Sequence, residues 1–480
     1  FVYGCMDSTA TNYNATANTD DGSCTFCYAV ADIGNDSITA CDSVLLSSNL
    51  IPSSTFCWQS SLSSNSLQWE MVGDNSFFSR FGEQGGCDIT FDQSGKPYIV
   101  FKSHISGWNN GVYSFSDTSY VFKLEDTTWT LVGNVPFFIG ATQYTKIIVN
   151  NSIPYVAFQD GNHGDRISVM KFDNNSWSYV GTPGFSTGGV IQDIDFKFDN
   201  NDIPYVTFRD WKTGQWIDLM IDGQLSVMKF DGANWVYVGG SSQGLELLNA
   251  DGALSPVNSP RLRFDGNIPY LAYTYSASAW VLQFNGSQWL QVGDSIPAID
   301  YTTIEFIGSS LSLGFRQNAP YDIETYSYNN QNWNPLGNTI TGYGESGDLQ
   351  FSLHNSTLYL GFTANAATGV QIMSYTNNNW QNFGPNLGVN NNIKPYFLSF
   401  ILDAYGSPYI IYRDDLDNYQ TKVMRLSGNC ENTNDSIWVS NTGTYYLTIT
   451  DSLGCTATDS VYVNVGVCGC TDSLAFNYDP

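Results

Sequence analysis

Charged residues, and basic residues above all, are scarce in this chain of 480 residues. Only 13% of the residues are Asp, Glu, Lys or Arg, about half of the ~25% that is usual in soluble globular proteins. The 18 Lys and Arg are outnumbered by 45 Asp and Glu, so the formal net charge is −27. Because such a chain repels phosphate groups, we expect neither nucleic acid nor anionic lipid among its partners. Cations, neutral sugars and proteins fit its charge better.

Catalytic motifs and long apolar runs are also missing. No apolar stretch approaches the roughly 20 residues that a membrane-spanning helix needs, so we expect no membrane insertion. No GxSxG, HExxH or P-loop motif occurs. Only eight arginines and no SxDxGxTW box are present, which argues against a sialidase. Among 45 acidic residues a pair of carboxylates arises by chance, so it does not indicate a glycosidase. We expect no enzymatic activity.

Ten cysteines stand in an acidic, lysine-poor chain. The three histidines are far apart in sequence, and no CxxC pair is followed by a second pair or by His, which argues against zinc. Disulfides in an oxidising compartment fit this composition better. We therefore expect an extracellular protein.

One sequence unit occurs seven times along the chain. Its best-preserved part is a Trp that begins a short strand ending in Gly. From Trp69 to Trp380 the units are about 52 residues apart, the spacing typical of propeller blades. The seven segments are 69–73, 129–133, 177–181, 235–239, 289–293, 333–337 and 380–384.

Three further strand-like segments precede each Trp from the second onward. In the third unit they are 193–199, 203–210 and 226–232, which alternate apolar and polar residues between Asn, Asp and Gly turns. Four short antiparallel strands per unit predict a β-propeller of seven blades. The last unit lacks its Trp strand, and residues 67–73 lack the three strands before them. We expect 67–73 to complete the last blade, closing the ring and protecting its edges.

The segments on either side of the propeller resemble one domain split in two. Joined across the insertion, Cys41, Trp58, 443–445 (GTY) and 454–455 (GC) follow, in order, the pattern of the Ig-like domains in giant surface proteins and gliding adhesins of Bacteroidota. The resemblance covers about 75 residues, and the intervening propeller departs from it. It implies a β-sandwich with the propeller inserted in a loop, which adjacent propeller termini make feasible.

This nesting implies disulfides between distant cysteines. Cys41 would pair with Cys455 between the sheets, near Trp58. Cys57 and Cys430 would clamp the points where the chain enters and leaves the propeller, and Cys27 would pair with Cys468. The alternative pairs neighbours, Cys27 with Cys41 and Cys430 with Cys455. Cys87 would be left over as a buried thiol in the first propeller strand.

The two ends of the chain share a short motif. Residues 4–24 and 469–480 resemble the GC-x-D-x-x-A-x-N-Y repeats, ending in DDGSC, of the same class of secreted bacterial proteins. Cys5 would pair with Cys24, and Cys470 with a cysteine beyond the chain end. Oxygen-bearing side chains of the first copy predict a Ca²⁺ site; they are Asp7, Asn12, Asn14, Asp20 and Asp21. The alternative is that these are turn residues of a disulfide-closed loop.

Polar residues follow the second strand of several blades. In a propeller these positions lie on the face that carries the connections between blades, so they would surround one mouth of the central channel. Exposed indoles there can stack on a sugar or a partner surface. The ligand-binding hypothesis names Trp108, Asp160, Arg209, Asp210, Trp211, Arg316, Arg413 and Asp414. The alternative is that these Arg and Asp side chains pair between blades and hold the ring together, whereas the seven repeat Trp are packing residues.

The sequence thus predicts an all-β segment of a large secreted cell-surface protein, exported like type IX substrates. Its function would be adhesion or assembly of a filament, with the propeller face recognising a glycan, a surface ligand or copies of itself. The alternatives are a carbohydrate-binding propeller and, less favoured, a glycoside hydrolase. The expected parts are a small disulfide repeat (1–26), the first half of the sandwich (27–61), the propeller (62–428), the second half (429–468) and the start of the next repeat (469–480).

Non-reducing peptide mapping tests the nested arrangement. We expect disulfide-linked peptides that contain Cys41 with Cys455, Cys57 with Cys430, and Cys27 with Cys468. A peptide linking Cys41 to Cys27 would overturn the split sandwich, since it requires neighbour pairing.

Overall fold

The structure is a computed structural model, and it describes most of the chain. For some residues, among them Cys41, Cys57, 104–116 and 210–211, only the backbone is described. The described residues are 2–7, 10, 17–24, 30–41, 43–48, 54–60, 67–73, 86–109, 112–125, 127–188, 190–211, 223–239, 258–317, 320–343, 347–364, 369–388, 395–404, 406–414, 420–428, 435–450 and 456–466.

The chain divides into two compact units. One unit combines both chain ends, Phe1–Gln68 with Gly428–Pro480, and the other is Trp69–Ser427. The described residues are strands and turns, with two short 3-10 helices at Val132–Asn134 and Gly161–His163. None of these residues belongs to a helix of the length and apolarity that crossing a membrane requires.

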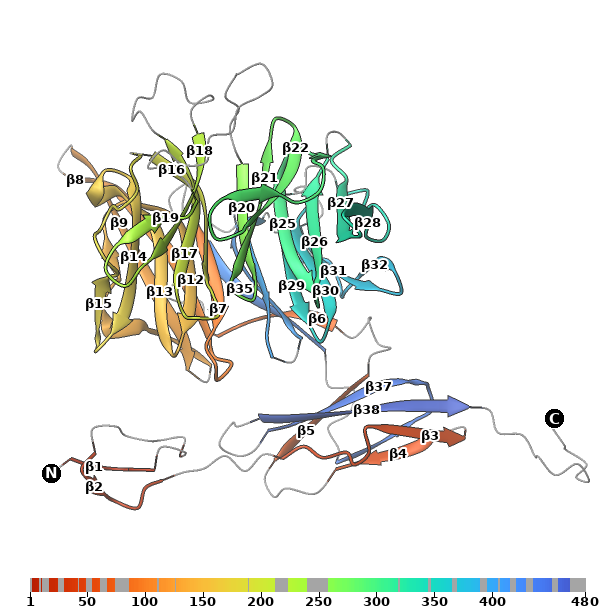
Figure 1. The fold of residues 1–480 in the computed structure, drawn as a ribbon. Coiled ribbons are helices and arrows are strands. Elements are labelled where there is room, and N and C mark those ends of the chain that lie inside the picture. Colours follow the sequence, from red (N-terminus) through yellow and green to blue (C-terminus); the bar gives the residue numbers. More distant parts are fainter. Residues whose placement is uncertain are drawn as a thin grey trace, which may run out of the picture. The chain divides into compact units, whose positions relative to one another are not determined.

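The larger unit consists of antiparallel sheets that follow one another along the chain (Figure 1). The first three sheets contain β7 (Cys87–Phe91), β8 (Pro97–Asn109), β9 (Val112–Glu125), β10 (Thr128–Leu131) and β11 (Phe138–Ile139); β12 (Thr142–Asn150), β13 (Ile153–Asp160), β14 (Arg166–Asp173) and β15 (Ser176–Tyr179); and β16 (Val190–Phe198), β17 (Pro204–Trp211), β18 (Gly223–Phe230) and β19 (Trp235–Tyr237).

The next four sheets repeat this plan. They contain β20 (Asn258–Asp265), β21 (Ile268–Tyr275), β22 (Ser278–Phe284), β23 (Trp289–Gln291) and β24 (Ile296–Pro297); β25 (Asp300–Ile307), β26 (Ser310–Arg316), β27 (Ile323–Asn329) and β28 (Asn332–Pro335); β29 (Gly347–His354), β30 (Thr357–Thr363), β31 (Val370–Thr376) and β32 (Asn379–Asn382); and β33 (Pro395–Leu402), β34 (Pro408–Asp414), β35 (Gln420–Gly428) and β6 (Leu67–Met71).

The first strands of these sheets pack against one another in a ring. In chain order each first strand contacts the next, from β7 to β12 and on to β33, and β33 contacts β7 again. The prediction of an all-β propeller is confirmed, and its described residues form seven sheets around the ring. We call the first strands the inner strands and each sheet a blade, numbered from β7–β10 as blade 1 to β33–β35 with β6 as blade 7.

Blade 7 is assembled from two distant parts of the chain. Strand β6 forms its outer strand beside β35. Val72 N–H donates to Val423 O at 3.0 Å, and Arg425 Nε donates to Glu70 Oε1 at 2.8 Å. The segment before blade 1 therefore closes the ring, because it supplies the strand that the last blade lacks.

A tryptophan of each outer strand joins its blade to the preceding one. Trp129 Nε1–H donates to Val72 O at 2.9 Å, so the closing segment is held from both sides. The same bond from an indole N–H to a main-chain carbonyl of the preceding blade recurs for Trp69, Trp177, Trp235, Trp289, Trp333 and Trp380. The repeated spacing of Trp and Gly has a packing cause, because five of the seven glycines leave room for the Trp of the next blade. The other two, Gly133 and Gly384, leave room for Phe172 and Leu426.

The smaller unit is a two-layer sandwich built from both chain ends. One sheet has the order β3 (Ser37–Cys41), β38 (Thr456–Gly466), β37 (Gly443–Thr450) and β5 (Thr55–Ser60), with β3 parallel to β38. The other pairs β36 (Ser436–Val439) with β4 (Val44–Ser47). Trp58 is fully buried between them and packs with Leu46, Val439 and Leu447.

The remaining described strands and cysteines belong to the chain ends and blade 1. Strands β1 (Tyr3–Gly4) and β2 (Thr19–Asp20) form a short parallel pair. Cys5 and Cys24 form a disulfide, as predicted. Cys87 is a buried thiol in β7, and burial raises the pKa of this thiol to about 12.

Substituting Gly73 tests the Trp–Gly contact that closes the ring. Gly73 has φ +71°, and a Cβ there would lie 2.6 Å from Trp129 Nε1. Gly266 has a similar φ of +59°, but a Cβ there would meet no atom within 4 Å. We expect Gly266→Ala to lower the free energy of unfolding by about 1 kcal/mol, and Gly73→Ala by about 2 kcal/mol more, because it also overpacks the blade interface.

Urea unfolding of the two variants and the parent chain measures the difference. Equal losses for Gly73→Ala and Gly266→Ala would mean that the contact with Trp129 does not constrain the blade interface.

Candidate functional site

The residues predicted to bind a ligand lie near one end of the inner strands, which we call the mouth. In six blades the register of the inner strand shifts near this end, as between Gln192 and Asp195. Residues of these bulges bond between inner strands: Tyr301 N–H donates to Ser259 Oγ at 3.2 Å. Five bulge residues other than Gly have positive φ, a conformation that tends to gather at functional sites; they are Tyr144, Asp193, Ser259, Tyr301 and Asp348.

Asp160, the last residue of β13, is fully buried at the mouth. Its carboxylate accepts hydrogen bonds from Ser168 Oγ at 2.7 Å, Asn162 N at 3.0 Å and Tyr179 OH at 3.3 Å. His163 Nδ1 lies 2.8 Å from it. Burial, followed by the Asp160 charge, raises the pKa of Tyr179 to about 12, so this hydroxyl stays a donor. All these partners belong to blade 2, so the carboxylate of Asp160 links parts of its own blade.

Arg316, the last residue of β26, is held by a carboxylate and two aromatic rings. Its Nε and Nη2 each donate to the Asp300 carboxylate at 2.9 Å, a two-point geometry that fixes the guanidinium plane. The guanidinium carbon lies 4.7 Å from the Tyr301 ring centroid and 5.4 Å from that of Tyr321. Burial raises the pKa of Asp300, although Arg316 acts to lower it.

Arg209, in β17, connects two blades. Its Nη1 donates to Asn258 Oδ1 of the next blade at 3.2 Å, and only 7% of Arg209 is exposed. Burial lowers the pKa of Arg209, while Asp193 acts to raise it. For the Asp193 carboxyl, burial raises the pKa, and Arg261 and Arg209 act to lower it. These groups form one charged set across the start of blades 3 and 4.

The other predicted mouth residues lie in strands. Arg413 and Asp414 end β34 and are buried, and Lys422 Nζ lies 2.8 Å from Asp414 Oδ2. Trp108 and Trp211 were expected in loops, but they lie in strands β8 and β17, which run further than the sequence pattern suggested. The side chains of Trp108, Asp210 and Trp211 lie outside the described residues.

The described contacts of Asp160, Arg316 and Asp414 lie within their own blades, whereas Arg209 bonds to the next blade, as the structural alternative expects. Ligand binding by the mouth residues stays a prediction.

A second set of polar residues, which the sequence analysis missed, lies on the inner strands. Asp88 accepts a hydrogen bond from Ile147 N of the next blade at 2.9 Å, and Asp195 accepts one from Leu262 N at 2.8 Å. Thr303 and Gln350 make the same bond to Phe351 N and Phe400 N. The sequence contains a signal for this set. When the seven inner strands are aligned, a polar residue precedes the same buried apolar position in each of them.

Basic residues gather around two of these carboxylates. Lys146 Nζ lies 3.5 Å from Asp88 Oδ1. Lys197 Nζ and Arg263 Nη1 each lie 3.5 Å from Asp195, and Arg263 Nε lies 2.9 Å from Glu305 Oε2. We call Asp88, Lys146, Asp195, Lys197, Arg263 and Glu305 the axial cluster. Its three basic groups balance its three acidic groups, in a chain whose net charge is −27.

Asp195 is the carboxylate that the axial cluster stabilises most clearly. Burial alone would raise its pKa, but Lys197, Arg263, Arg261 and the Leu262 N–H together lower the pKa to about 2. Burial also lowers the pKa of Lys197, since it outweighs the opposing effect of Asp195, although the Lys197 side chain keeps 32% of its surface exposed.

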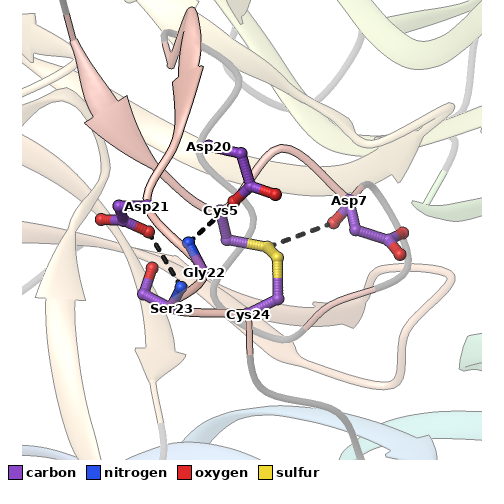
Figure 2. Close-up of a disulfide and its surroundings, with 7 residues drawn as sticks. All are labelled: Cys5, Asp7, Asp20, Asp21, Gly22, Ser23 and Cys24. Atoms are coloured by element: carbon purple, nitrogen blue, oxygen red, sulfur yellow. Dashed lines mark hydrogen bonds between the residues drawn. A yellow bond between two sulfur atoms is a disulfide. The ribbon is translucent and has the colours of Figure 1, made fainter.

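The acidic residues of the N-terminal loop do not converge in the described part of the chain. Asp20 Oδ1 accepts from Gly22 N at 3.1 Å, and Asp21 Oδ1 accepts from Ser23 N at 2.9 Å, as in tight turns. Figure 2 shows Asp7 and Asp21 on opposite sides of the Cys5–Cys24 disulfide. No group of three potential metal ligands occurs among the described residues. Asn12 and Asn14 lie outside them, so the Ca²⁺ site stays a prediction.

The other predicted disulfides also lie outside the described residues. Cys27, Cys430, Cys455, Cys468 and Cys470 are not described, and only the backbones of Cys41 and Cys57 are.

A hollow of about 180 Å³ lies between blades 4 and 5. Aromatic rings and short polar side chains from both blades line it. They include Asp265, Tyr270, Gln283, Gln291, Phe306 and Tyr328. Tyr270 and Phe306 meet edge to face across the blade interface, with ring centroids 5.1 Å apart.

Several solved structures of other proteins resemble this chain in fold. No family model and no curated protein matches the chain. The Dos1 propeller is 13% identical over 74% of this chain and 96% of its own, with a TM-score of 0.44. The SapL1 lectin, solved in complex with alpha methyl fucoside, is 12% identical over 64% and 98%, with a TM-score of 0.40. NanB sialidase from Streptococcus pneumoniae is 9% identical over 75% and 70%, with a TM-score of 0.40.

Replacing Asp195 tests the electrostatics of the axial cluster. A carboxyl whose pKa falls from about 3.8 to about 2 on folding stabilises the fold above pH 4, and this contribution disappears as the pH falls through 2. We expect Asp195→Asn to lower the free energy of unfolding by about 2 kcal/mol at pH 7, with a smaller difference from the parent at pH 3. Urea unfolding of both proteins between pH 2.5 and 7 measures it; a difference independent of pH would contradict the role of the charge.

Proposed function

We propose that this chain is a non-enzymatic recognition segment of a large secreted cell-surface protein, an adhesin or a subunit of an extracellular filament. The propeller would be its binding module, and the sandwich would be the host domain that links it to the rest of the protein. Recognition would be non-covalent and would use the rigid surface of the blades.

The observation that carries this proposal is that carboxylates at the mouth and in the axial cluster bond to groups of the propeller itself. The carboxylates of Asp160, Asp195 and Asp300 are held by donors or cations of their own or adjacent blades. A general acid or base must be able to exchange its proton with a substrate. These carboxylates instead stabilise the blades, which supports a scaffold for binding rather than a catalyst.

The sandwich and the disulfide support an extracellular location. The Cys5–Cys24 disulfide needs an oxidising compartment. Tyr445 OH donates to the main-chain carbonyl of Asn441 at 2.9 Å, a contact similar to the tyrosine corner of Ig-like sandwiches. Together with the GC-x-D motif, these features favour an Ig-like host domain in a secreted surface protein of the Bacteroidota type.

The second candidate function, a carbohydrate-binding propeller, is favoured by the hollow between blades 4 and 5. Aromatic rings beside amide and carboxylate groups are the side chains that bind sugars, because the rings cover the apolar face and the polar groups bond to hydroxyls. It is a special case of the first, in which the recognised surface is a glycan.

A binding assay with beads that carry the whole chain distinguishes recognition from catalysis. We expect saturable retention of the beads on immobilised bacterial or marine polysaccharides, or on surfaces coated with the same chain. Reducing-sugar assays of the same polysaccharides should detect no release of product. Product release that is lost on Asp160→Asn or Asp300→Asn would instead establish a hydrolase, and light scattering of the free chain distinguishes self-assembly from a monomer.

A further inference from the structure

A cross-strand pair of an aromatic and a basic residue recurs in the propeller. In four blades a Tyr of the second strand lies opposite a Lys or Arg of the third, and these pairs are Tyr98–Lys123, Tyr155–Lys171, Tyr205–Lys229 and Tyr409–Arg425. Lys229 Nζ lies 5.9 Å from the Tyr205 ring centroid. The long basic side chain thus runs along the tyrosine ring, where it covers the ring.

Blades 4 and 6 depart from this rule. In blade 6 Tyr359 lies opposite Ser374, and the ring of Phe383 meets the Tyr359 ring edge to face at 5.1 Å. Blade 4 departs from the rule at the hollow. There Tyr270 lies opposite Gln283, which is shorter than Lys and uncharged. Gln291 of the outer strand, which pairs with Leu282, also lines the hollow.

The aromatic contact beneath these positions is unchanged between the two blades. Tyr205 and Phe264 meet at 5.0 Å between blades 3 and 4, and Tyr270 and Phe306 meet at 5.1 Å between blades 4 and 5. The change from a basic residue to Gln283 on an otherwise repeated interface therefore leaves the hollow open.

The groups around the hollow have the chemistry of a sugar site. Gln283 and Gln291 carry amides, which can both donate and accept hydrogen bonds. Burial, then the charges of Asp265 and Tyr328, raises the pKa of Tyr270, which keeps its hydroxyl protonated as a further donor. Gln291 Nε2 donates to Gly293 O at 2.8 Å, so this side chain is held in place.

We propose that this hollow binds one neutral monosaccharide residue of a glycan. This inference rests on the proposed recognition function. Its volume of about 180 Å³ is below the ~300 Å³ at which sites for larger ligands begin. The hollow has Asp265 and no basic residue among its lining groups, so a uronic or sialic acid would meet repulsion. A neutral ring can lie over the aromatic groups and exchange hydrogen bonds with the two amides.

Refilling the hollow with the residue that other blades use tests the proposal. Gln283→Lys restores the Tyr–Lys pair at a register that four blades accept, so we expect the variant to fold. The matched control is Lys229→Gln, which makes the reverse change at the same register of blade 3. Saturation-transfer NMR and calorimetry would use the methyl glycosides of glucose, galactose, mannose, fucose, N-acetylglucosamine and glucuronic acid.

We expect at least one neutral glycoside to bind the parent chain and Lys229→Gln, and to bind Gln283→Lys at least tenfold more weakly. The glucuronide should bind the parent at least tenfold more weakly than that glycoside. Equal affinity of the parent and Gln283→Lys, loss of binding in Lys229→Gln, or no binding of any neutral glycoside would overturn the proposal. Circular dichroism melting confirms that the variants are folded.

The bead assay separates this inference from the proposed function. If no glycoside binds but Gln283→Lys beads adhere as the parent does, the hollow is not the sugar site and the recognition function stands. If neither parent nor variant beads adhere to any surface, both proposals fail.

Discussion

The propeller depends on one repeated contact, in which the indole N–H of an outer-strand Trp donates to a main-chain carbonyl of the preceding blade. Trp69 donates to Pro385 O at 2.8 Å and Trp129 to Val72 O at 2.9 Å, so the contact continues across the point where the two chain segments meet. It satisfies two polar groups at a mostly apolar interface, where an unpaired one would cost about 1–3 kcal/mol. Together with the bonds from main-chain N–H groups to side chains of the neighbouring blade, it aligns adjacent blades.

Scarcity of basic residues imposes the second constraint. With 18 Lys and Arg for 45 acidic residues, most carboxylates must be solvated or accept hydrogen bonds from main-chain N–H groups. Where a carboxylate is buried, as at Asp88 and Asp195, the fold supplies both a main-chain donor from the next blade and a cation from the axial cluster. Buried charges are tolerated in such fully bonded settings. They bind the inner strands to one another.

The repeat architecture was predictable from the sequence because its cause is local. The Trp-to-Gly segments, the strand alternation and the orphan strand at 67–73 all follow from patterns within about 50 residues. The Cys5–Cys24 pair followed from a shorter motif, residues 4–24. The lengths of β8 and β17 were misjudged, since hydrogen bonding to β9 and β18 extends them through Trp108 and Trp211. The mouth was predicted as a position in the fold, but the sequence left open whether Asp160 and Arg316 face a ligand or bond to strands of the propeller. That depends on partners, such as Ser168 and Asp300, that only the folded register brings near.

Irregularity within the repeats carries more information about binding than the repeats do. Positions at which all blades agree, such as the Trp and its Gly, are explained by packing, and they would be needed in a propeller of any function. The pair of Tyr270 and Gln283 departs from the aromatic–basic rule on a blade whose aromatic contact with the next blade is unchanged. Removing a long side chain from an interface leaves a void that costs stability, so an open, polar-lined hollow is a feature that packing alone does not explain. Occupation by a ligand with its own hydroxyl groups would account for it.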